Sequence, residues 1–179
     1  MNIFHLHDSP QICAQYHNDK HVVKMCVEYA QLLSTSHRVL DGSLYYSKTK
    51  NGRKIRRWLL DDNREPLLYK ASHINHPSNL WTRSTDSNYR FVFDLWDNLC
   101  KEYSYRYNRE HMSFTKLREV LSNIPDSIHK GPITKYAQAM PDDCKMSDSI
   151  EAYRTYYRKY KGRFSRWTRR NEPEWFRND

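Results

Sequence analysis

The chain has 179 residues, and its 30 lysines and arginines outnumber 21 acidic residues, which gives a formal net charge of +9. This excess of positive charge indicates a polyanionic partner, above all nucleic acid. No stretch approaches 18 consecutive apolar residues, which excludes a membrane-spanning helix. With only four glycines, the chain has few positions for positive-φ turns, and this favours helices over a many-stranded β fold.

The cysteines and histidines give no sign of a metal centre. Four cysteines stand far apart with no Cys-x-x-Cys pair, which argues against a zinc ribbon and fits a reducing cytoplasm. The start of the chain lacks the pattern of a signal peptide, so we expect a cytoplasmic protein. His5-x-His7 and His17-x-x-x-His21 have ligand-compatible spacing, but such pairs are common by chance, and we predict no metal or cofactor.

We expect one mainly α-helical, compact domain spanning residues 1–179, with about four main helices and long functional loops. Residues 1–14 form an extended N-terminal piece in this prediction. The predicted helices follow in chain order: one from Gln15 through Arg38 that ends at Gly42, one from about Ser87 to Tyr107, one that begins at Ser113 and ends before Pro125, and one over Ser149–Arg170. Arg53–Leu60 is predicted as a basic turn of helix.

The first long helix, Gln15–Arg38, has two contrasting faces at helical spacing. The predicted buried stripe consists of Val23, Cys26, Val27, Ala30 and Leu33. The opposite side, which we call the polar row, carries His17, His21, Lys24, Glu28, Gln31, Thr35 and Arg38. A solvated face is more often a mixture of Glu and Lys, so this row is interpreted as the floor of a polar site.

Lys24 and Glu28 stand one helical turn apart, with His21 one turn before Lys24. A desolvated amine beside a carboxylate is the equipment of Schiff-base chemistry at a sugar C1′ carbon. An ordinary i,i+4 ion pair, worth only ~0.3–0.5 kcal/mol, explains the same spacing. From spacing alone the ion pair is the better explanation.

The segment Ser72–Asn88 is the least periodic part of the chain and is rich in His, Asn and Ser. Its composition predicts an ordered functional loop. The candidate substrate-binding residues in it are His73, Asn75, His76, Asn79, Trp81 and Arg83.

The C-terminal segment from Tyr153 to Arg170 holds basic and aromatic residues and no acidic ones. Its aromatic stripe, Tyr153, Tyr157, Tyr160, Phe164 and Trp167, is predicted to be core, because aromatic residues at helical spacing usually pack. Its closely spaced positive side chains are predicted to contact the phosphates along a nucleic-acid backbone. The candidate nucleic-acid-binding residues are Arg154, Arg158, Lys159, Lys161, Arg163, Arg166, Arg169 and Arg170.

Several short motifs resemble those of the pyrimidine-dimer DNA glycosylases, the phage endonuclease V-like family. They are the opening Met-Asn-Ile-Phe-His-Leu-His, a long first helix with an internal Glu28 that ends in Leu40-Asp41-Gly42, the pair His76-Pro77 followed by Glu102, Arg106 and Tyr107, and the basic aromatic stretch Tyr156–Gly162. The similarity covers about the first 110 residues and the tail.

The resemblance implies an α-helical protein that flips a nucleotide, cleaves the glycosidic bond and then the backbone through an imine. It implies that Glu28 is the acid/base carboxylate and that His76 contacts the DNA backbone. The family's nucleophile is an N-terminal amine exposed after removal of Met before a small residue. Asn2 is not small, so Met1 is expected to stay; either Lys24 substitutes or the chemistry is lost or changed.

The predicted function is a phage-type DNA glycosylase/AP lyase, monomeric and without a cofactor, that acts on DNA in the cytoplasm. Its catalytic candidates are Glu28, Lys24 and His21, while Trp81 and Arg83 would line the pocket. Two alternatives remain open: a non-catalytic protein that binds a nucleotide-like small molecule, and a nucleic-acid-binding accessory protein.

Overall fold

The computed structural model describes residues 1–177. Within them lie seven α-helices, two short 3₁₀ turns, one π turn and one antiparallel β-hairpin, so the chain is mainly α. The α-helices are α1 (Pro10–Tyr16), α2 (Asp19–Asp41), α3 (Pro77–Thr82), α4 (Asp86–Tyr107), α5 (Met112–Ser122), α6 (Ser149–Tyr156) and α7 (Glu174–Arg177), and the strands are β1 (Ser43–Lys48) and β2 (Lys54–Leu59). No helix in this part of the chain is both long enough and apolar enough to cross a membrane.

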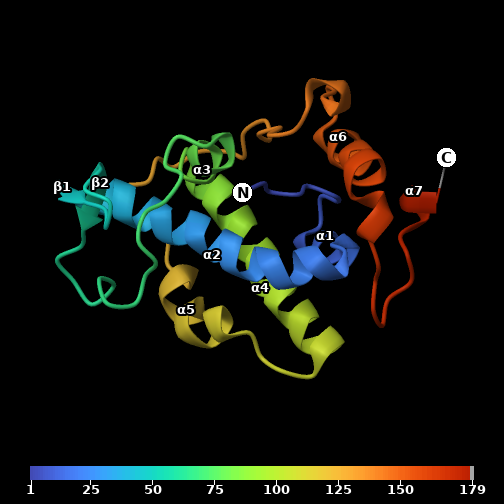
Figure 1. Cartoon of the computed structure of the whole chain (residues 1–179), viewed down its shortest axis with the longest axis horizontal. Helices are drawn as coiled ribbons and strands as arrows, with labels where there is room; N and C mark the ends of the chain where they lie inside the picture. Colours follow the sequence, from blue (N-terminus) through green and yellow to red (C-terminus); the bar gives the residue numbers. More distant parts are fainter. Residues whose placement is uncertain (178–179) are drawn as a thin grey trace.

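Helices α2 and α4 cross at the centre of the molecule, with α1 packed on α4 and α5 on α2 (Figure 1). The predicted stripe of α4 is confirmed, since Val92, Leu95, Trp96, Leu99 and Tyr103 are all buried. The Trp96 indole donates a hydrogen bond of 2.8 Å to the Cys26 carbonyl of α2. This contact gives the largest buried ring of the core a polar partner and fixes the two helices against each other.

The first long helix starts at Asp19 and not at Gln15. Asn18 has extended backbone geometry, and its side chain accepts a hydrogen bond of 2.9 Å from the His21 amide. An Asn at this position is a strong helix start, which the hydrophobic period alone does not reveal. The predicted end at Gly42 is confirmed. A Cβ at Gly42 would lie 2.6 Å from the Arg38 carbonyl oxygen, so the chain needs glycine where it turns from α2 into β1.

The two faces of α2 are divided differently from the prediction. Cys26, Ala30 and Leu33 are buried as expected, but Val23 is exposed. From the polar row, His17, His21, Thr35 and Arg38 are buried, and only Lys24, Glu28 and Gln31 reach the surface. The buried members have internal partners that replace water: the His17 imidazole, for example, lies 2.8 Å from the Tyr29 hydroxyl.

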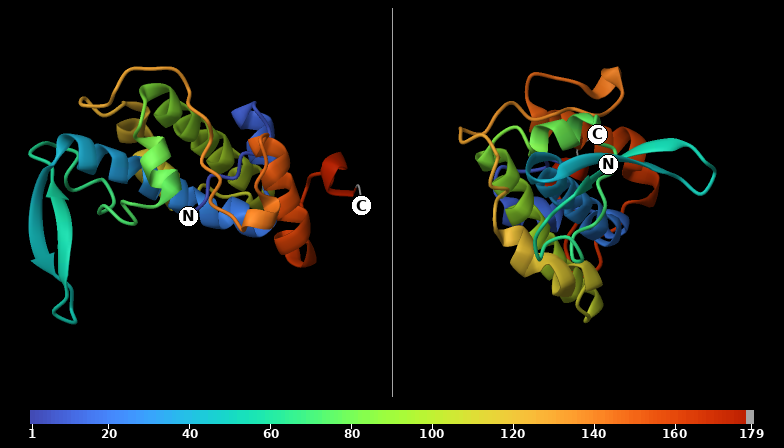
Figure 2. Two further views of the ribbon diagram at one scale, coloured as in Figure 1. Left: turned by 90° about the horizontal axis from the view of Figure 1, so that it is seen from above. Right: turned by 90° about the vertical axis from the view of Figure 1, so that its left-hand side faces the viewer.

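The basic turn of helix predicted over Arg53–Leu60 is wrong, because this segment is strand β2 paired with β1. The Asn51-Gly52 sequence is a strong hairpin signal, and Gly52 adopts a φ of 76°, which few other residues tolerate. The hairpin projects away from the helical body as an arm (Figure 2). Tyrosine-rich β1 gives it the strand propensity that the basic residues of β2 lack.

The C-terminal helix predicted over Ser149–Arg170 is also shorter than expected. The Asp148 carboxylate caps α6 as predicted, accepting a hydrogen bond of 2.8 Å from the Ile150 amide. The helix loosens to a π turn over Tyr157–Lys161 and a 3₁₀ turn over Gly162–Phe164. The chain then doubles back, and the Trp167 indole donates to the Tyr16 carbonyl at 3.0 Å. Of the aromatic stripe, Tyr153, Tyr157 and Trp167 are buried, whereas Tyr160 is exposed.

The N-terminal piece is extended only as far as Asp8, because Pro10 begins α1. Ile3, Phe4 and Leu6 are buried in the main core cluster. The Phe4 amide donates to the Tyr29 hydroxyl at 3.1 Å, and the Cys13 thiol donates to the Phe4 carbonyl at 3.1 Å. These contacts hold the first residues along α2, between α3 and the segment that leads to α6 (Figures 1 and 2).

Candidate functional site

Glu28 of α2 lies between two amines. Its Oε2 is 3.5 Å from the amino group of Met1, and its Oε1 is 3.1 Å from Nζ of Lys24. The two amines differ in how they are held, since the Lys24 side chain is 63% exposed while the Met1 side chain is 4% exposed. The Glu28 side chain, at 17%, is reachable from solvent but partly shielded. The buried side chain of Met1 fixes its amine beside Glu28, whereas the Lys24 amine ends an exposed side chain, so the Met1 group is the better positioned of the two.

The position of the Met1 amine follows from core packing. Met1 itself packs against the main cluster. Ile3 and Phe4 are buried directly after it, so the end of the chain has little freedom. Sequence reasoning raised an N-terminal amine only through the family resemblance. The apolar residues at positions 3, 4 and 6 are the signal in the sequence that the first residues of the chain are packed against the core.

His76, in the loop before α3, lies close enough to Met1 and Glu28 for both charges to act on its imidazole. Burial lowers the pKa of the His76 imidazole, with further lowering from the Met1 ammonium and His73 and a smaller opposing effect of Glu28. The His76 Nδ1 accepts a hydrogen bond of 3.2 Å from the Ser78 amide, so the neutral ring carries its proton on Nε2. This arrangement places a neutral hydrogen-bond donor beside the amine and carboxylate.

The loop is held in shape from α3 and the turn after it. Nδ2 of Asn79 donates to the Ser72 carbonyl at 2.8 Å, and Arg83 donates to the Ile74 carbonyl at 2.6 Å. His73 adopts a φ of 48°, a left-handed conformation that is uncommon outside glycine. Local strain of this kind persists only where surrounding contacts enforce it, and such positions cluster at functional sites.

The six predicted substrate-binding residues therefore divide into three groups. His73, Asn75 and His76 present side chains at the surface of the loop. Asn79 and Arg83 support its backbone. Trp81 does not line a pocket: it is buried, stacks on Tyr136 at 4.8 Å, and its indole donates to the Thr134 carbonyl. Its size and apolar surface favour core packing over the predicted pocket wall.

His21, predicted as catalytic, lies in the core. Its ring stacks on Phe4 with centroids 4.2 Å apart, and its Nδ1 is 2.5 Å from the Tyr157 hydroxyl. Burial, followed by nearby cations, lowers the pKa of the His21 imidazole to about 2. Two turns of helix, about 10 Å, separate it from Glu28. The structure therefore brings Glu28 and Lys24 together with Met1 and His76, and leaves His21 out of this group.

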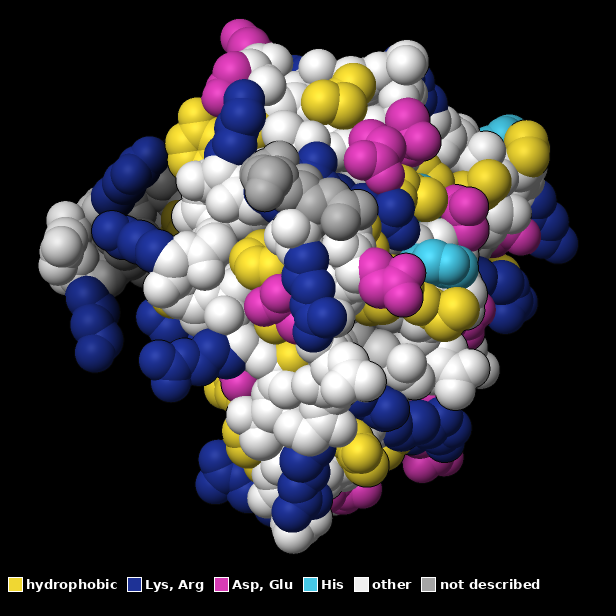
Figure 3. Space-filling view, turned by 90° about the vertical axis from the view of Figure 1, so that its right-hand side faces the viewer, with side chains coloured by type: hydrophobic (Ala, Val, Ile, Leu, Met, Phe, Trp, Pro, Cys, Tyr) yellow, Lys and Arg dark blue, Asp and Glu magenta, His cyan; other side chains and the backbone are white. Residues whose placement is uncertain are grey.

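Most of the predicted phosphate-binding cations at the C-terminus already have partners within the protein. Arg154, Arg158 and Arg169 donate to backbone carbonyls, and Lys159 and Arg170 pair with Asp143 and Glu102. Acidic side chains lie among the Lys and Arg side chains at this end of the molecule (Figure 3). Lys161 sits over the Tyr156 ring, and Arg163 and Arg166 are exposed. The expected dense cationic helix is thus reduced to these three side chains, because the helix unwinds after Tyr156.

The candidate metal ligands are also occupied otherwise. The His5 ring is stacked on Tyr136 at 3.6 Å and lies 2.9 Å from the Ser149 hydroxyl. Within residues 1–177, no three His, Cys, Asp or Glu side chains come close enough to hold a metal ion.

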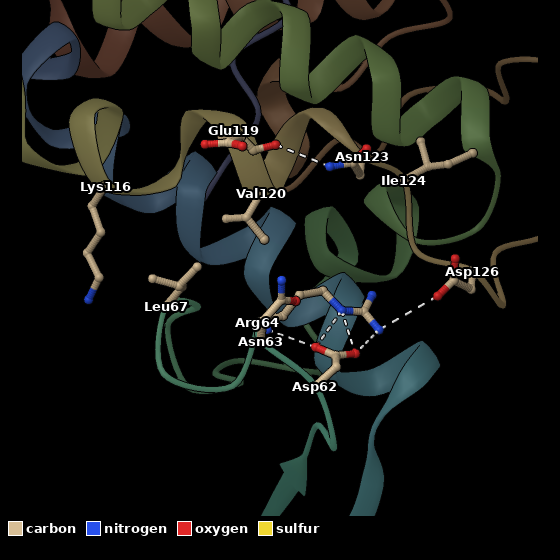
Figure 4. Close-up of a pocket in the computed structure, with 10 residues that line it drawn as sticks. All are labelled: Asp62, Asn63, Arg64, Leu67, Lys116, Glu119, Val120, Asn123, Ile124 and Asp126. Carbon is tan, nitrogen blue, oxygen red and sulfur yellow. Dashed lines mark hydrogen bonds and ion pairs between the residues drawn. The ribbon is translucent and has the colours of Figure 1, made fainter.

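A cavity of about 590 Å³ opens between α5 and the loop after β2. Figure 4 shows its main charged group, Arg64, between Asp62 and Asp126. Arg64 also donates to Asp41 at 2.6 Å, and the Asp62 bond is 2.7 Å. The positive charge of Arg64 is therefore compensated by these carboxylates, and the ion pairs connect the end of α2 to the segment after α5. The cavity lacks the amine and carboxylate pair that makes the Glu28 site chemically distinctive.

Comparison of the chain with protein-family models, curated proteins and solved structures gave no match.

Proposed function

We propose that this protein is a DNA-acting glycosylase/AP lyase whose reacting groups are an amine and the Glu28 carboxylate. The observation that carries the proposal is the position of Glu28 between the Met1 amine at 3.5 Å and the Lys24 amine at 3.1 Å. The proposal includes a phage-type protein acting in the cytoplasm, where four buried, free cysteines remain reduced.

In the proposed reaction, Glu28 accepts a proton from the ammonium, and the neutral amine attacks the C1′ carbon of a flipped nucleotide. The N–C1′ bond forms as the bond from C1′ to the base breaks, and the base leaves with its electron pair and takes up a proton. Opening of the sugar ring gives an iminium ion. Removal of a C2′ proton then expels the 3′ phosphate, and water releases the enzyme. His76, with its proton on Nε2, is suited to donate a hydrogen bond to a phosphate or sugar oxygen.

Met1 is the preferred nucleophile. An α-amino group is a weaker base than a lysine amine, so more of it is neutral near pH 7. In addition, the buried Met1 side chain holds its amine in place, while the Lys24 side chain is exposed. Lys24 then serves as an ion-pair partner that orients the Glu28 carboxylate.

Borohydride trapping on duplex DNA with an abasic site tests the proposal. The wild-type chain is expected to form a covalent adduct, and peptide mapping is expected to place it on Met1. Glu28→Gln should reduce the rate of adduct formation by about 10²–10⁴-fold, the usual contribution of a positioned acid/base group. Lys24→Gln is the matched control on the same carboxylate, and it should retain most of the rate.

The absence of an adduct at any pH would remove the lyase claim. An adduct mapped to Lys24 would preserve the amine/carboxylate pair and reverse the assignment of the nucleophile. A Glu28→Gln variant with normal trapping and normal binding would leave only a nucleic-acid-binding accessory role. Circular dichroism of each variant separates loss of chemistry from loss of fold.

A further inference from the structure

The β1–β2 hairpin carries several positive charges and no acidic residue of its own to compensate them. Its residues from Ser43 to Leu59 include no Asp or Glu, and its six cations are Lys48, Lys50, Arg53, Lys54, Arg56 and Arg57. The hairpin stands out from the helical body (Figure 2). Among the described residues, Arg57 is the one of these six cations with a hydrogen bond to the body, at 3.4 Å to the Ala71 carbonyl.

The strand register places Lys48, Lys54 and Arg56 on one face with Tyr46 and Trp58. Directly paired residues share a face, and the pairs Leu44–Trp58, Tyr46–Arg56 and Lys48–Lys54 alternate with pairs on the other face. Nζ of Lys54 lies 3.9 Å from the centre of the Tyr46 ring, and the Arg56 guanidinium 6.0 Å from the centre of the Trp58 ring. The face therefore offers cations oriented by rings, a composition suited to nucleic acid.

Lys48 and Lys54 lie directly opposite each other in this register. Like charges at such a position destabilise a two-stranded ribbon. A bound polyanion would convert this repulsion into attraction, because each phosphate can neutralise a lysine. An unfavourable pair on an exposed arm is thus understandable if the arm has an anionic partner.

The base of the arm is firmly attached. Arg38, 3% exposed, donates to the carbonyls of Trp58 and Tyr69 and to the Glu65 carboxylate at 2.5 Å. The Glu65 carboxylate in turn accepts a hydrogen bond from the Leu60 amide at 2.9 Å. These contacts tie both the end of β2 and the loop after it to the C-terminal end of α2. The arm therefore holds a defined direction relative to the body.

The cationic face borders the loop that leads to α3. A cleft of about 780 Å³ lies between the hairpin and the loop, lined by Tyr46, Arg53, Lys54, Arg56, Trp58 and His73 among others. The same loop reaches His76 three residues later, beside Met1 and Glu28. The loop before α3 thus borders the hairpin through His73 and carries His76 three residues further along the chain.

We propose that the β1–β2 hairpin is a nucleic-acid-binding arm that holds the phosphate backbone of a duplex beside the Glu28 site. The proposal deepens the proposed function and depends on it for the identity of the polyanion. A two-stranded ribbon has the width to follow a groove of B-form DNA. Lys54 and Arg56 make the phosphate contacts, and Tyr46 and Trp58 orient them.

The test measures binding of a labelled, undamaged DNA duplex over a series of salt concentrations. Lys54→Ala with Arg56→Ala is expected to reduce the slope of log K against log[salt] by about 1.8, because each lost phosphate contact in B-DNA lowers it by ~0.9. The matched control, Lys101→Ala with Lys145→Ala, also removes two positive charges, but each of these lysines is already paired, with Asp97 and Asp142 respectively. The control slope is expected to stay near that of the wild type.

A charge reversal separates binding from folding. Lys54→Glu places opposite charges across the Lys48 pair, so it should leave the melting temperature unchanged or raised while it lowers duplex affinity. The proposal that the hairpin binds nucleic acid would be overturned by a melting temperature that falls in parallel with affinity. A slope of log K against log[salt] equal to the wild type in both hairpin variants would also overturn it. Binding of a mononucleotide without binding of duplex would also overturn it.

Borohydride trapping distinguishes this proposal from the one on which it rests. If the hairpin binds DNA but the protein has no lyase activity, the hairpin variants change the slope of log K against log[salt] while the wild-type protein forms no adduct. If the lyase is right and the arm wrong, the adduct forms and the slope does not respond to the hairpin.

Discussion

Arg106 of α4 offers the sharpest test of what holds the molecule together. Its side chain is fully buried, and it donates to Glu102 at 2.7 Å, to Asp19 at 2.9 Å and to the Gln15 carbonyl at 2.9 Å. It therefore joins α4 to the end of α1 and the first residue of α2. Replacing Arg106 by Ala would leave Glu102, itself 4% exposed, with Arg170 as its remaining cation.

Removal of one partner of a buried ion pair typically lowers the free energy of unfolding by about 3–5 kcal/mol. Because Arg170 still neutralises Glu102, the lower value of about 3 kcal/mol is expected for Arg106→Ala. For a domain of this size, 1 kcal/mol shifts the melting temperature by roughly 2–4 °C, so the expected decrease is roughly 6–12 °C. Urea denaturation at pH 7 gives the free energy of unfolding, and calorimetry gives the melting temperature.

Arg118→Ala is the control, because Arg118 also pairs with a carboxylate, Asp97, but is 54% exposed. A pair of that kind contributes roughly 0–1 kcal/mol.

Burial acts to raise the pKa of Glu102, but hydrogen bonds from Arg170 and Arg106 hold it below 4.5. A carboxyl with a lowered folded-state pKa stabilises the fold above the unfolded value and loses that contribution as pH falls. The difference in free energy of unfolding between wild type and Arg106→Ala should therefore become smaller below pH 4.5. Equal losses for Arg106→Ala and Arg118→Ala would refute this account of the cluster.

Two further predictions concern the arm and the buried histidines. Gly42→Ala should lower the free energy of unfolding by about 1–3 kcal/mol, as overpacking does, because the new Cβ meets the Arg38 carbonyl at 2.6 Å; a denaturation curve that matches the wild type would contradict this. Burial lowers the pKa of His5, His17 and His37 from 6.5 to about 4 each, so the unfolded chain binds more protons between these values. Stability is therefore expected to be complete above pH 6.5 and to decline as pH falls toward 4, and denaturant midpoints independent of pH over this window would be the opposite result.

The long helices could be predicted because their signals are local and repeated. The stripe of α4 from Val92 to Tyr103 recurs over about three turns, and Asp148 and Gly42 mark helix ends with their own chemistry. The phase of α2 could not be predicted in the same way. Its histidines and Arg38 look polar in the sequence, but each finds a partner inside the protein, and only the tertiary structure supplies that partner.

The hairpin is not evident from Arg53–Leu60 alone, although the Lys-Asn-Gly turn before it is visible in the sequence. Arg53–Leu60 alternates only weakly, whereas the pairing depends on β1 and on the Gly52 turn between the strands. The C-terminal helix was overestimated for the converse reason. Its helical period is continuous, but the hydrogen bond from the Asp19 amide to the Arg166 carbonyl requires the chain to fold back before that residue.

A core residue can help to position a candidate site that it does not touch. His21 lies away from Glu28, yet its ring stacks on Phe4 at 4.2 Å, and Phe4 is fixed further by the hydroxyl of Tyr29. Phe4 in turn is three residues from the amine beside Glu28. The residue predicted as catalytic thus acts through packing, as one of the groups that determine where the first residues of the chain lie. The same reasoning explains why Glu28, alone in the polar row, meets an amine on both sides: it is the position of α2 where the pinned N-terminal piece ends.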